Sequence, residues 1–219
     1  MYVIAAVARN GAIGVTDPDG TCRMPWPRLQ ADTHWFQALT LAANPVRMAR
    51  HWIRYPAAID VAGGSWSEAL WHTKGNVMLC GWKTAATFPQ PLRHRIVVVL
   101  RDRTSHGVGD WPCKARTFAE AYEKATVTHH ALHVFAIGGS QVYATALQHP
   151  ACEGLFLTEL DPAYPDATTW WPTEVEWQAG VLRSGEVRYQ RESVSDWIQE
   201  PDRPPYRFGI WRRQGRRLS

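Results

Sequence analysis

The feature that most constrains the fold is a series of short, continuous apolar runs that alternate with helical patterns. Five of these runs are expected to be strands, at residues 2–8, 76–81, 95–100, 132–139 and 154–160. A strand that is apolar along its whole length needs cover on both faces, and this is typical of a parallel sheet between helices.

Helical patterns lie between the expected strands, at residues 29–41, 84–88, 117–126 and 140–148. Two later segments, around residues 177–189 and 205–213, alternate apolar and polar residues, and we expect them to form a closing antiparallel hairpin. The sequence therefore predicts an α/β fold with a mainly parallel central sheet, flanking helices and an antiparallel C-terminal edge hairpin.

The length of the chain predicts one domain over residues 1–219, because 219 residues that are 45% hydrophobic can build one sizeable core. Residues 42–75 fit this domain least well, since a compact fold joins a helix to the next strand with a few residues. This segment contains prolines, a glycine pair and three tryptophans. We interpret it as an inserted subdomain or a long lid.

The N-terminal residues and the cysteines bear on where the protein works. Residues 1–14 carry a short apolar run without a basic leader, so we expect neither a signal peptide nor a membrane span. The four cysteines are widely scattered and form no CxxC pair, which argues against a metal cluster or a disulfide framework. We therefore expect a soluble cytoplasmic protein with reduced thiols and no metal.

The formal charge of +4 suits a phosphate-bearing small ligand or, less specifically, nucleic acid. Much of the excess lies in the C-terminal stretch RFGIWRRQGRRLS. A basic tail is most often a solvated end, so nucleic acid is the less favoured partner.

One acid, Asp32, lies in an otherwise apolar helical pattern, in the segment MPWPRLQADTHWF. Leu29, Trp35 and Phe36 recur at spacings that share one helical face with Asp32. Burying an unpaired carboxylate costs several kcal/mol, roughly, so an inward-facing Asp32 needs a partner or a proton. Alternatively, Asp32 lies in the first turn, where its charge suits the helix dipole and water reaches it. The segment alone leaves both readings open.

Two junctions combine a strand, a glycine turn and a helix start: CGWKTAATF at residues 80–88 and AIGGSQVY at residues 136–143. Glycine permits the sharp turn, and the free amides at a helix N-terminus form an anion site. Two such junctions in one sheet indicate that a pyrophosphate or an extended phosphate ligand crosses its carboxyl edge. Neither stretch matches the GxGxxG or GxxxxGK[ST] motif.

Taken in order, these stretches resemble the dihydrofolate reductase family. The resemblance is carried by IAAVARNGAIG, MPWPRLQADTHWF, GWKT, PLRHR, VVVLRD, IGGSQVY, LTEL and WWP. It covers nearly everything outside residues 42–75. The resemblance implies a dihydrofolate-reductase-like fold and the NADPH-dependent reduction of 7,8-dihydrofolate to tetrahydrofolate.

The resemblance gives Asp32 a catalytic role. It implies that Asp32 binds the amino group and a ring nitrogen of the pterin and promotes protonation of N5, through a water admitted near Trp26. Thr158 resembles the hydroxyl that supports Asp32, and Tyr143 resembles a residue near the nicotinamide. Protonating N5 makes the imine electron-poor for hydride transfer to C6, and a raised pKa suits a carboxyl to this task.

The same resemblance assigns substrate binding to Ile4, Ala6, Phe36, Phe88, Arg95 and Ile137. Ile4 and Ile137 are expected to offer backbone carbonyls to the pterin amino group, and the two phenylalanines to flank the benzoyl ring. Arg95 resembles the arginine that pairs with the α-carboxylate of the substrate's glutamate, a task that suits a planar guanidinium. Arg93 is an alternative, because His94 stands where the family has a glycine.

Cofactor binding is assigned by resemblance to Ala6, Ile13, Gly14, Gly81, Lys83, Thr84, Arg101, Arg116, Gly138, Gly139, Ser140, Gln141 and Val142. Arg101 matches a basic residue for the adenosine 2′-phosphate, which favours NADPH over NADH, and Arg116 is a second candidate. Trp82 departs from the family, which has an arginine there. The loop at residues 14–24 is longer than the family's active-site lid, and lid motion often controls product release.

Two other functions compete with this reading. The related pyrimidine reductase of riboflavin synthesis shares the fold and the cofactor edge, but Asp32 and Arg95 argue against it. A folate-fold binding or assembly protein would use the tryptophan-rich segment 42–75 as an interface, and self-association through this segment is expected in that case.

Overall fold

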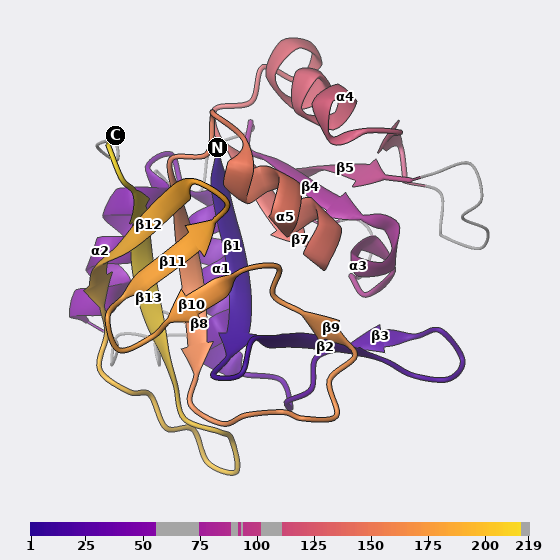
Figure 1. Cartoon of the computed structure of the whole chain (residues 1–219). Helices are drawn as coiled ribbons and strands as arrows, with labels where there is room; N and C mark the ends of the chain where they lie inside the picture. Colours follow the sequence, from indigo (N-terminus) through magenta and orange to yellow (C-terminus); the bar gives the residue numbers. More distant parts are fainter. Residues whose placement is uncertain (56–74, 89–91, 93, 102–110, 216–219) are drawn as a thin grey trace.

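The structure is a computed structural model that describes residues 1–55, 75–88, 92, 94–101 and 111–215. A ten-stranded sheet forms its centre (Figure 1). The parallel part contains, in spatial order, β8 (Gly154–Leu160), β1 (Tyr2–Ala8), β7 (Val134–Gly138), β4 (Val77–Gly81), β5 (Ile96–Leu100) and β6 (Cys113–Ala115).

An antiparallel part continues the sheet beyond β8, through β13 (Tyr206–Arg213), β12 (Val187–Val194), β11 (Val181–Ser184) and β10 (Glu174–Glu176). The predicted fold class, a mainly parallel sheet with an antiparallel C-terminal edge, is confirmed.

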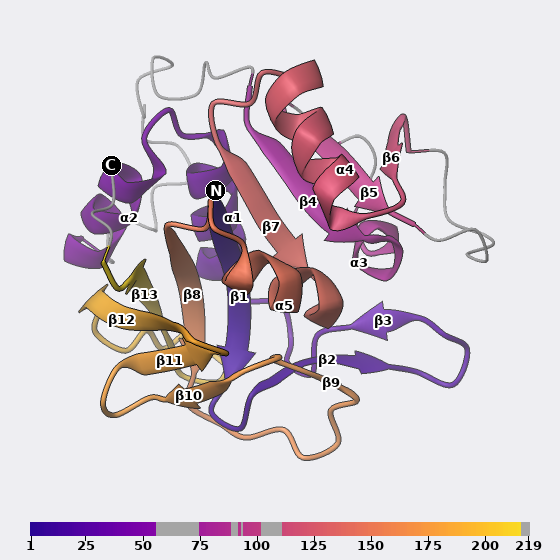
Figure 2. The ribbon, with the colours of Figure 1, turned by 45° about the horizontal axis from the view of Figure 1, so that its top comes forward.

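Helices cover both faces of the sheet (Figures 1 and 2). They are α1 (Gln30–Leu41), α2 (Pro45–Arg54), α3 (Trp82–Ala86), α4 (Phe118–Glu123) with its π-helical continuation η3 (Lys124–Thr128), and α5 (Ser140–Gln148). Side chains of β1 enter two separate cores in alternation: Tyr2 and Ile4 join the core with α1 and α2, and Val3 and Ala5 join the core with α4 and α5. This alternation explains why the strand is apolar throughout.

A smaller sheet faces the carboxyl ends of β4 and β7 (Figure 2). It consists of β3 (Cys22–Arg23), β2 (Ala12–Thr16) and β9 (Thr169–Trp170). The predicted lid at residues 14–24 thus forms most of the hairpin β2–β3. The Thr16 amide donates to Thr168 Oγ1 over 2.7 Å, which attaches the hairpin to the segment that precedes β9.

The sequence was wrong about the strands near residues 177–189. This segment contains β11, a turn at Gly185 with φ of +59°, and the first residues of β12, whereas the prediction was one strand. The strand that forms a hairpin with β13 is β12. The alternation of apolar and polar residues runs up to the turn and resumes after it, so periodicity does not reveal the turn.

The first part of segment 42–75 is built into the core. Val46, Ala49 and Trp52 of α2 are buried in the core that also contains α1. This face of α2 is therefore not available to a partner. Residues 56–74, where the other two tryptophans of the expected insert or interface lie, are outside the described residues.

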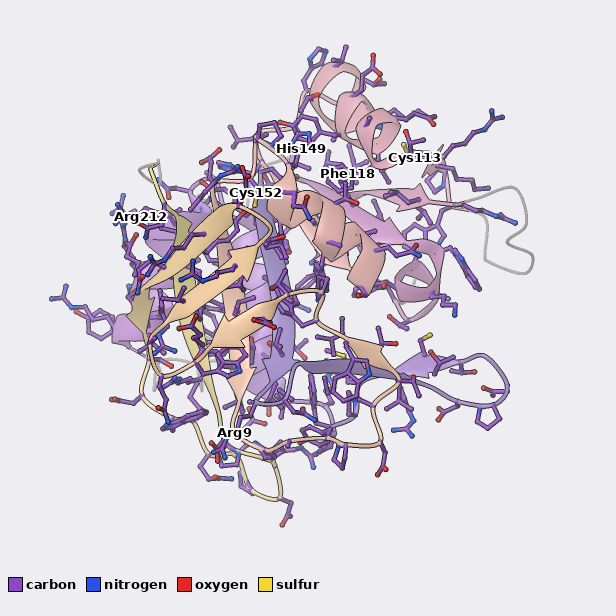
Figure 3. The ribbon with its side chains drawn as sticks, viewed as in Figure 1. Arg9, Cys113, Phe118, His149, Cys152 and Arg212 are labelled. Atoms are coloured by element: carbon purple, nitrogen blue, oxygen red, sulfur yellow. The ribbon has the colours of Figure 1, made fainter. Side chains whose placement is uncertain are left out.

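The basic C-terminal stretch is not a solvated end over its described part. Arg212 and Arg213 belong to β13, on which Figure 3 labels Arg212. Arg212 forms an ion pair of 3.2 Å with Glu192, and Arg213 donates to the His149 carbonyl over 2.7 Å. Residues 216–219 lie outside the described part of the chain. None of the described helices is long and apolar enough to cross a membrane.

Replacing Trp35 tests the packing of α1 against the sheet. Trp35 is fully buried and stacks on Phe208 of β13 with ring centres 4.5 Å apart. We expect Trp35→Ala to lower the free energy of unfolding by about 3–5 kcal/mol, because it leaves a cavity in the core. Denaturant titration measures this loss. Trp197→Ala, at a residue that is 47% exposed, is the matched control and should cost less than about 1 kcal/mol. Equal losses would contradict the assigned packing.

Candidate active site

A cleft of about 800 Å³ lies at the carboxyl ends of β4, β5 and β7, the edge where parallel α/β sheets bind ligands. All the residues assigned to the cofactor by resemblance line it, from Ala6 on β1 to Val142 on α5. Its walls also include Ile4, Asp32, Phe36, Phe88, Ile137 and Tyr143. The lining of the cleft therefore brings together Asp32 and residues of both glycine junctions.

Asp32 combines the two readings that the sequence left open. It lies in the first turn of α1, yet it is partly buried and its Oδ1 accepts a hydrogen bond of 2.6 Å from Thr158 Oγ1. Burial raises the pKa of Asp32 to about 6; the Thr158 hydrogen bond opposes this rise, and the negative charge of Glu200 adds to it. With a pKa of about 6, the Asp32 carboxyl carries a proton in part of the molecules at neutral pH.

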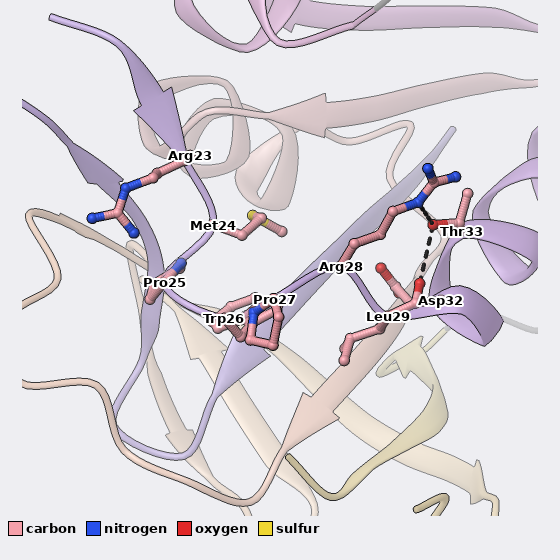
Figure 4. Close-up of a pocket in the computed structure, with 9 residues that line it drawn as sticks. All are labelled: Arg23, Met24, Pro25, Trp26, Pro27, Arg28, Leu29, Asp32 and Thr33. Atoms are coloured by element: carbon pink, nitrogen blue, oxygen red, sulfur yellow. Dashed lines mark hydrogen bonds between the residues drawn. The ribbon is translucent and has the colours of Figure 1, made fainter. Parts of the chain in front are cut away.

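A second cavity, of about 530 Å³, reaches Asp32 from outside (Figure 4). Trp26 and Leu29 line it, and Asp32 and Thr33 line both this cavity and the main cleft. Trp26 is buried and packs against Tyr164, with ring centres 5.3 Å apart. Trp26 and Asp32 thus line the same cavity.

Tyr143 on α5 and the pair Gly138 and Gly139 before it line the cleft. The Tyr143 hydroxyl donates to the Ile4 carbonyl over 3.1 Å. Burial, together with the charge of Asp32, raises the pKa of Tyr143, so the hydroxyl keeps its proton. Gly138 has φ of +120°, and a Cβ there would lie 3.1 Å from the Tyr143 hydroxyl oxygen. Only glycine allows this close approach.

The residues assigned to the tail of the substrate are not all in the cleft. Phe36 and Phe88 face one another with ring centres 6.0 Å apart and nearly parallel planes. Arg95 lies outside the cleft lining, with its guanidinium carbon 6.0 Å from the centre of the Phe36 ring and Nη1 donating to Thr40 Oγ1 over 3.1 Å. Burial lowers the pKa of Arg95 from its ordinary value. Arg93, the alternative, lies outside the described residues.

The other end of the cleft has the chemistry of a phosphate site. The amides at the start of α5 follow Gly139, where a Cβ would lie 3.5 Å from Thr84 Oγ1 of the facing junction. Lys83, Arg101 and Arg116 add cationic side chains to this lining. Free helix amides and cations fit the phosphates of a dinucleotide. Trp82, which replaces the family's arginine, also lines the cleft, and Lys83 Nζ lies 5.7 Å from the centre of its ring.

Sequence reasoning missed part of the site. Among the lining residues that it did not assign are Thr16, Cys22, Arg23, Met24, Thr33 and Thr169. Most belong to the hairpin β2–β3 or to β9, which pairs with it, so the pairing of the small sheet brings them to the cleft. The expected lid at residues 14–24 could have pointed to the lining residues of the hairpin β2–β3. No local sequence signal marks Thr169.

A family model described as dihydrofolate reductase matches residues 70–193, which is more than half of the chain. The chain belongs to the dihydrofolate reductase family. The matched residues include both glycine junctions and Thr158. Asp32 of this dihydrofolate reductase family member precedes the matched residues.

Relatives with this name are distant in sequence. The chain is 27% identical over 168 residues to a bifunctional dihydrofolate reductase-thymidylate synthase of Acanthamoeba polyphaga mimivirus, covering 74% of this chain but only 25% of that protein. It is 26% identical to a dihydrofolate reductase of Heliothis virescens, over 78% of each chain. It is 24% identical to that of Gallus gallus, over 96% of this chain and 94% of the other.

The raised pKa of Asp32 predicts a pH-dependent stability in this dihydrofolate reductase family member. Unfolded Asp32 loses its proton near pH 3.8, whereas the folded protein keeps it to about pH 6. The folded state thus binds more protons between these values, so ionising Asp32 destabilises the fold as the pH rises. We expect Asp32→Asn to increase the free energy of unfolding above pH 6 by about 1–3 kcal/mol.

Denaturant titrations between pH 4 and pH 8 measure this effect. Asp166→Asn, at an exposed position, is the matched control and should leave the pH dependence as in the unaltered protein. A parallel loss of stability in Asp32→Asn at every pH would contradict the raised pKa.

Proposed function

We propose that the protein reduces 7,8-dihydrofolate to 5,6,7,8-tetrahydrofolate with NADPH, and that residues 1–219 act as one dihydrofolate-reductase-like domain. The observation that carries this proposal is the position of Asp32. Among the described residues that line the cleft and the outer cavity, it is the only carboxylate, and it is hydrogen-bonded to Thr158. Family membership supports the substrate, since the relatives named above carry the name of this activity.

The chemistry requires one hydride and one proton. When bound, NADPH supplies the hydride that adds to C6 of the pterin, while a proton from solvent adds to N5 and completes the reduction. The protein's part is to hold the pterin, exclude bulk water and deliver this proton. A carboxyl with a pKa of about 6 keeps a useful protonated fraction at neutral pH.

Asp32 has two tasks in this proposal. Its carboxyl binds the amino group and a ring nitrogen of the pterin, and it promotes protonation of N5 through water. The outer cavity supports this route, because Trp26 and Asp32 both line it. Thr158 holds the carboxyl in place from β8. The carbonyls of Ile4 and Ile137 then accept from the pterin amino group.

The far end of the cleft is assigned to the cofactor. The amides that follow Gly139 and the side chains of Lys83 and Thr84 bind the pyrophosphate. Arg101 and Arg116 are assigned to the 2′-phosphate, which distinguishes NADPH from NADH.

Asp32→Asn tests the proton route. The asparagine side chain holds the same space but cannot supply a proton, so we expect the rate at pH 7 to fall about a hundredfold to ten-thousandfold. The rate is followed as the dihydrofolate-dependent loss of NADPH absorbance. NADPH binding, measured by tryptophan fluorescence, should persist in the variant. Full activity at neutral pH in a folded variant would refute the assignment.

Arg101→Ala tests the choice of cofactor. Losing a charge-assisted contact to the 2′-phosphate should raise KM for NADPH about tenfold or more and leave KM for NADH nearly unchanged. Steady-state rates with both cofactors measure the difference. Arg54→Ala, at an exposed position of α2, is the control and should change neither constant. Equal effects on both cofactors would show that Arg101 does not bind the 2′-phosphate.

A further inference from the structure

The first turn of α1 is capped by a residue that is distant in sequence. Leu29 occupies the N-cap position of α1 and has no polar side chain that could accept from the free amides. Instead, Glu200, in the connection between β12 and β13, accepts hydrogen bonds from the amides of Gln30 and Ala31. Its Oε2 lies 3.1 Å from the Gln30 amide nitrogen, and its Oε1 lies 2.9 Å from that of Ala31.

Glu200 is held in its charged form at this place. Burial opposes its ionisation, but hydrogen bonds from the Ala31 amide, the Tyr206 hydroxyl and the Gln30 amide outweigh burial and keep the pKa of Glu200 below its ordinary value. The positive end of the α1 dipole also favours an anion here. A fixed negative charge therefore lies at the start of the helix turn that carries Asp32.

The other titratable groups around Asp32 are neutral or lie in the outer cavity. Tyr143 on α5 and Tyr206 on β13 both interact with the Asp32 charge, and burial raises the pKa of each, so they stay uncharged. Arg28, before α1, and Arg23 on β3 line the outer cavity, and Arg23 is paired with Asp17 at 2.9 Å. Among the described residues, Glu200 is thus the acid whose charge acts on Asp32.

We propose that Glu200 is a positioning residue for the reaction: its carboxylate anchors the first turn of α1 through the Gln30 and Ala31 amides and holds a negative charge next to the turn that carries Asp32. This inference rests on the proposed role of Asp32 in protonating the substrate. Glu200 itself lines neither cavity and does not touch the substrate site.

Glu200→Gln tests the proposal, because it keeps the length of the side chain and one accepting oxygen while removing the charge. The titration midpoint of the Asp32 carboxyl is measured by carbon-13 NMR of aspartate-labelled protein, with Asp32→Asn to assign the signal. We expect the midpoint to fall by about half a pKa unit, which is about threefold in the protonated fraction above that midpoint. The rate of NADPH-dependent reduction should fall by the same factor at pH 8 and change little at pH 5.

Asp202→Asn is the matched control. It removes the same charge from an exposed position in the same connection, where Asp202 has φ of +56°, a conformation that asparagine adopts readily. The Asp32 midpoint should stay unchanged in this control. An unchanged midpoint in Glu200→Gln, or an equal fall in both variants, overturns the proposal. A rate reduced equally at every pH would indicate a purely structural role and also overturns it.

A second variant covers the case in which Glu200→Gln does not fold. Glu200→Ala removes the charge without placing a side-chain amide against the Gln30 and Ala31 amides, which water can then bind instead. The Asp32 midpoint should fall here as well, and no change would overturn the proposal. The NMR midpoint does not depend on activity. Full activity in Asp32→Asn would refute the proposed role of Asp32, and absence of dihydrofolate-dependent NADPH oxidation by the unaltered protein would refute the proposed function, while the Asp32 midpoints test the effect of Glu200 separately.

Discussion

Burial of a parallel sheet on both of its faces is the constraint on which the rest of the structure depends. Along β1, neighbouring side chains enter opposite cores, one with α1 and α2 and the other with α4 and α5. The faces are therefore closed to ligands, and the carboxyl edge is where the main cleft lies. Functional groups must then come from the ends of elements, as Asp32 does from the start of α1 and Gly138 from the end of β7.

The sequence predicted those parts of the fold whose signals are local. β1, β8 and α5 have the predicted bounds, because a continuous apolar run or a helical pattern after a glycine turn is contained within a few residues. The bounds of the helix with Asp32 were predicted within one residue. Asp32 lies in its first turn and also points inward to Thr158, so the two positions that the sequence left open are compatible. The small sheet was not predicted, since β9 joins β2 only through long-range pairing.

The residues of the candidate site divide in the same way: some carry a local sequence signal, and others come to the site only through long-range packing. Motifs and resemblance assigned residues of both glycine junctions to the cofactor, and these assigned residues all line the cleft. The cap on α1 could not be found in this way, because Glu200 lies 170 residues from the amide of Gln30 and sits in a connection without periodicity. Arg95 stays a predicted substrate ligand. Its guanidinium lies outside the cleft lining, near Thr40 and Phe36 of α1, and this place depends on how α1 packs, which no local pattern reveals.

The environment of Asp32 explains how one carboxyl can be held in place and still carry a proton in part of the molecules at neutral pH. A hydrogen bond from Thr158 orients the carboxyl but stabilises its charged form, which alone would release the proton at lower pH. Burial acts in the opposite direction, and the charge of Glu200 acts with burial. The balance leaves the pKa of Asp32 about one unit below neutral pH, where roughly a tenth of the molecules carry the proton. The remaining molecules hold an anion that suits the pterin amino group, so one position can serve both of the tasks that we propose for Asp32.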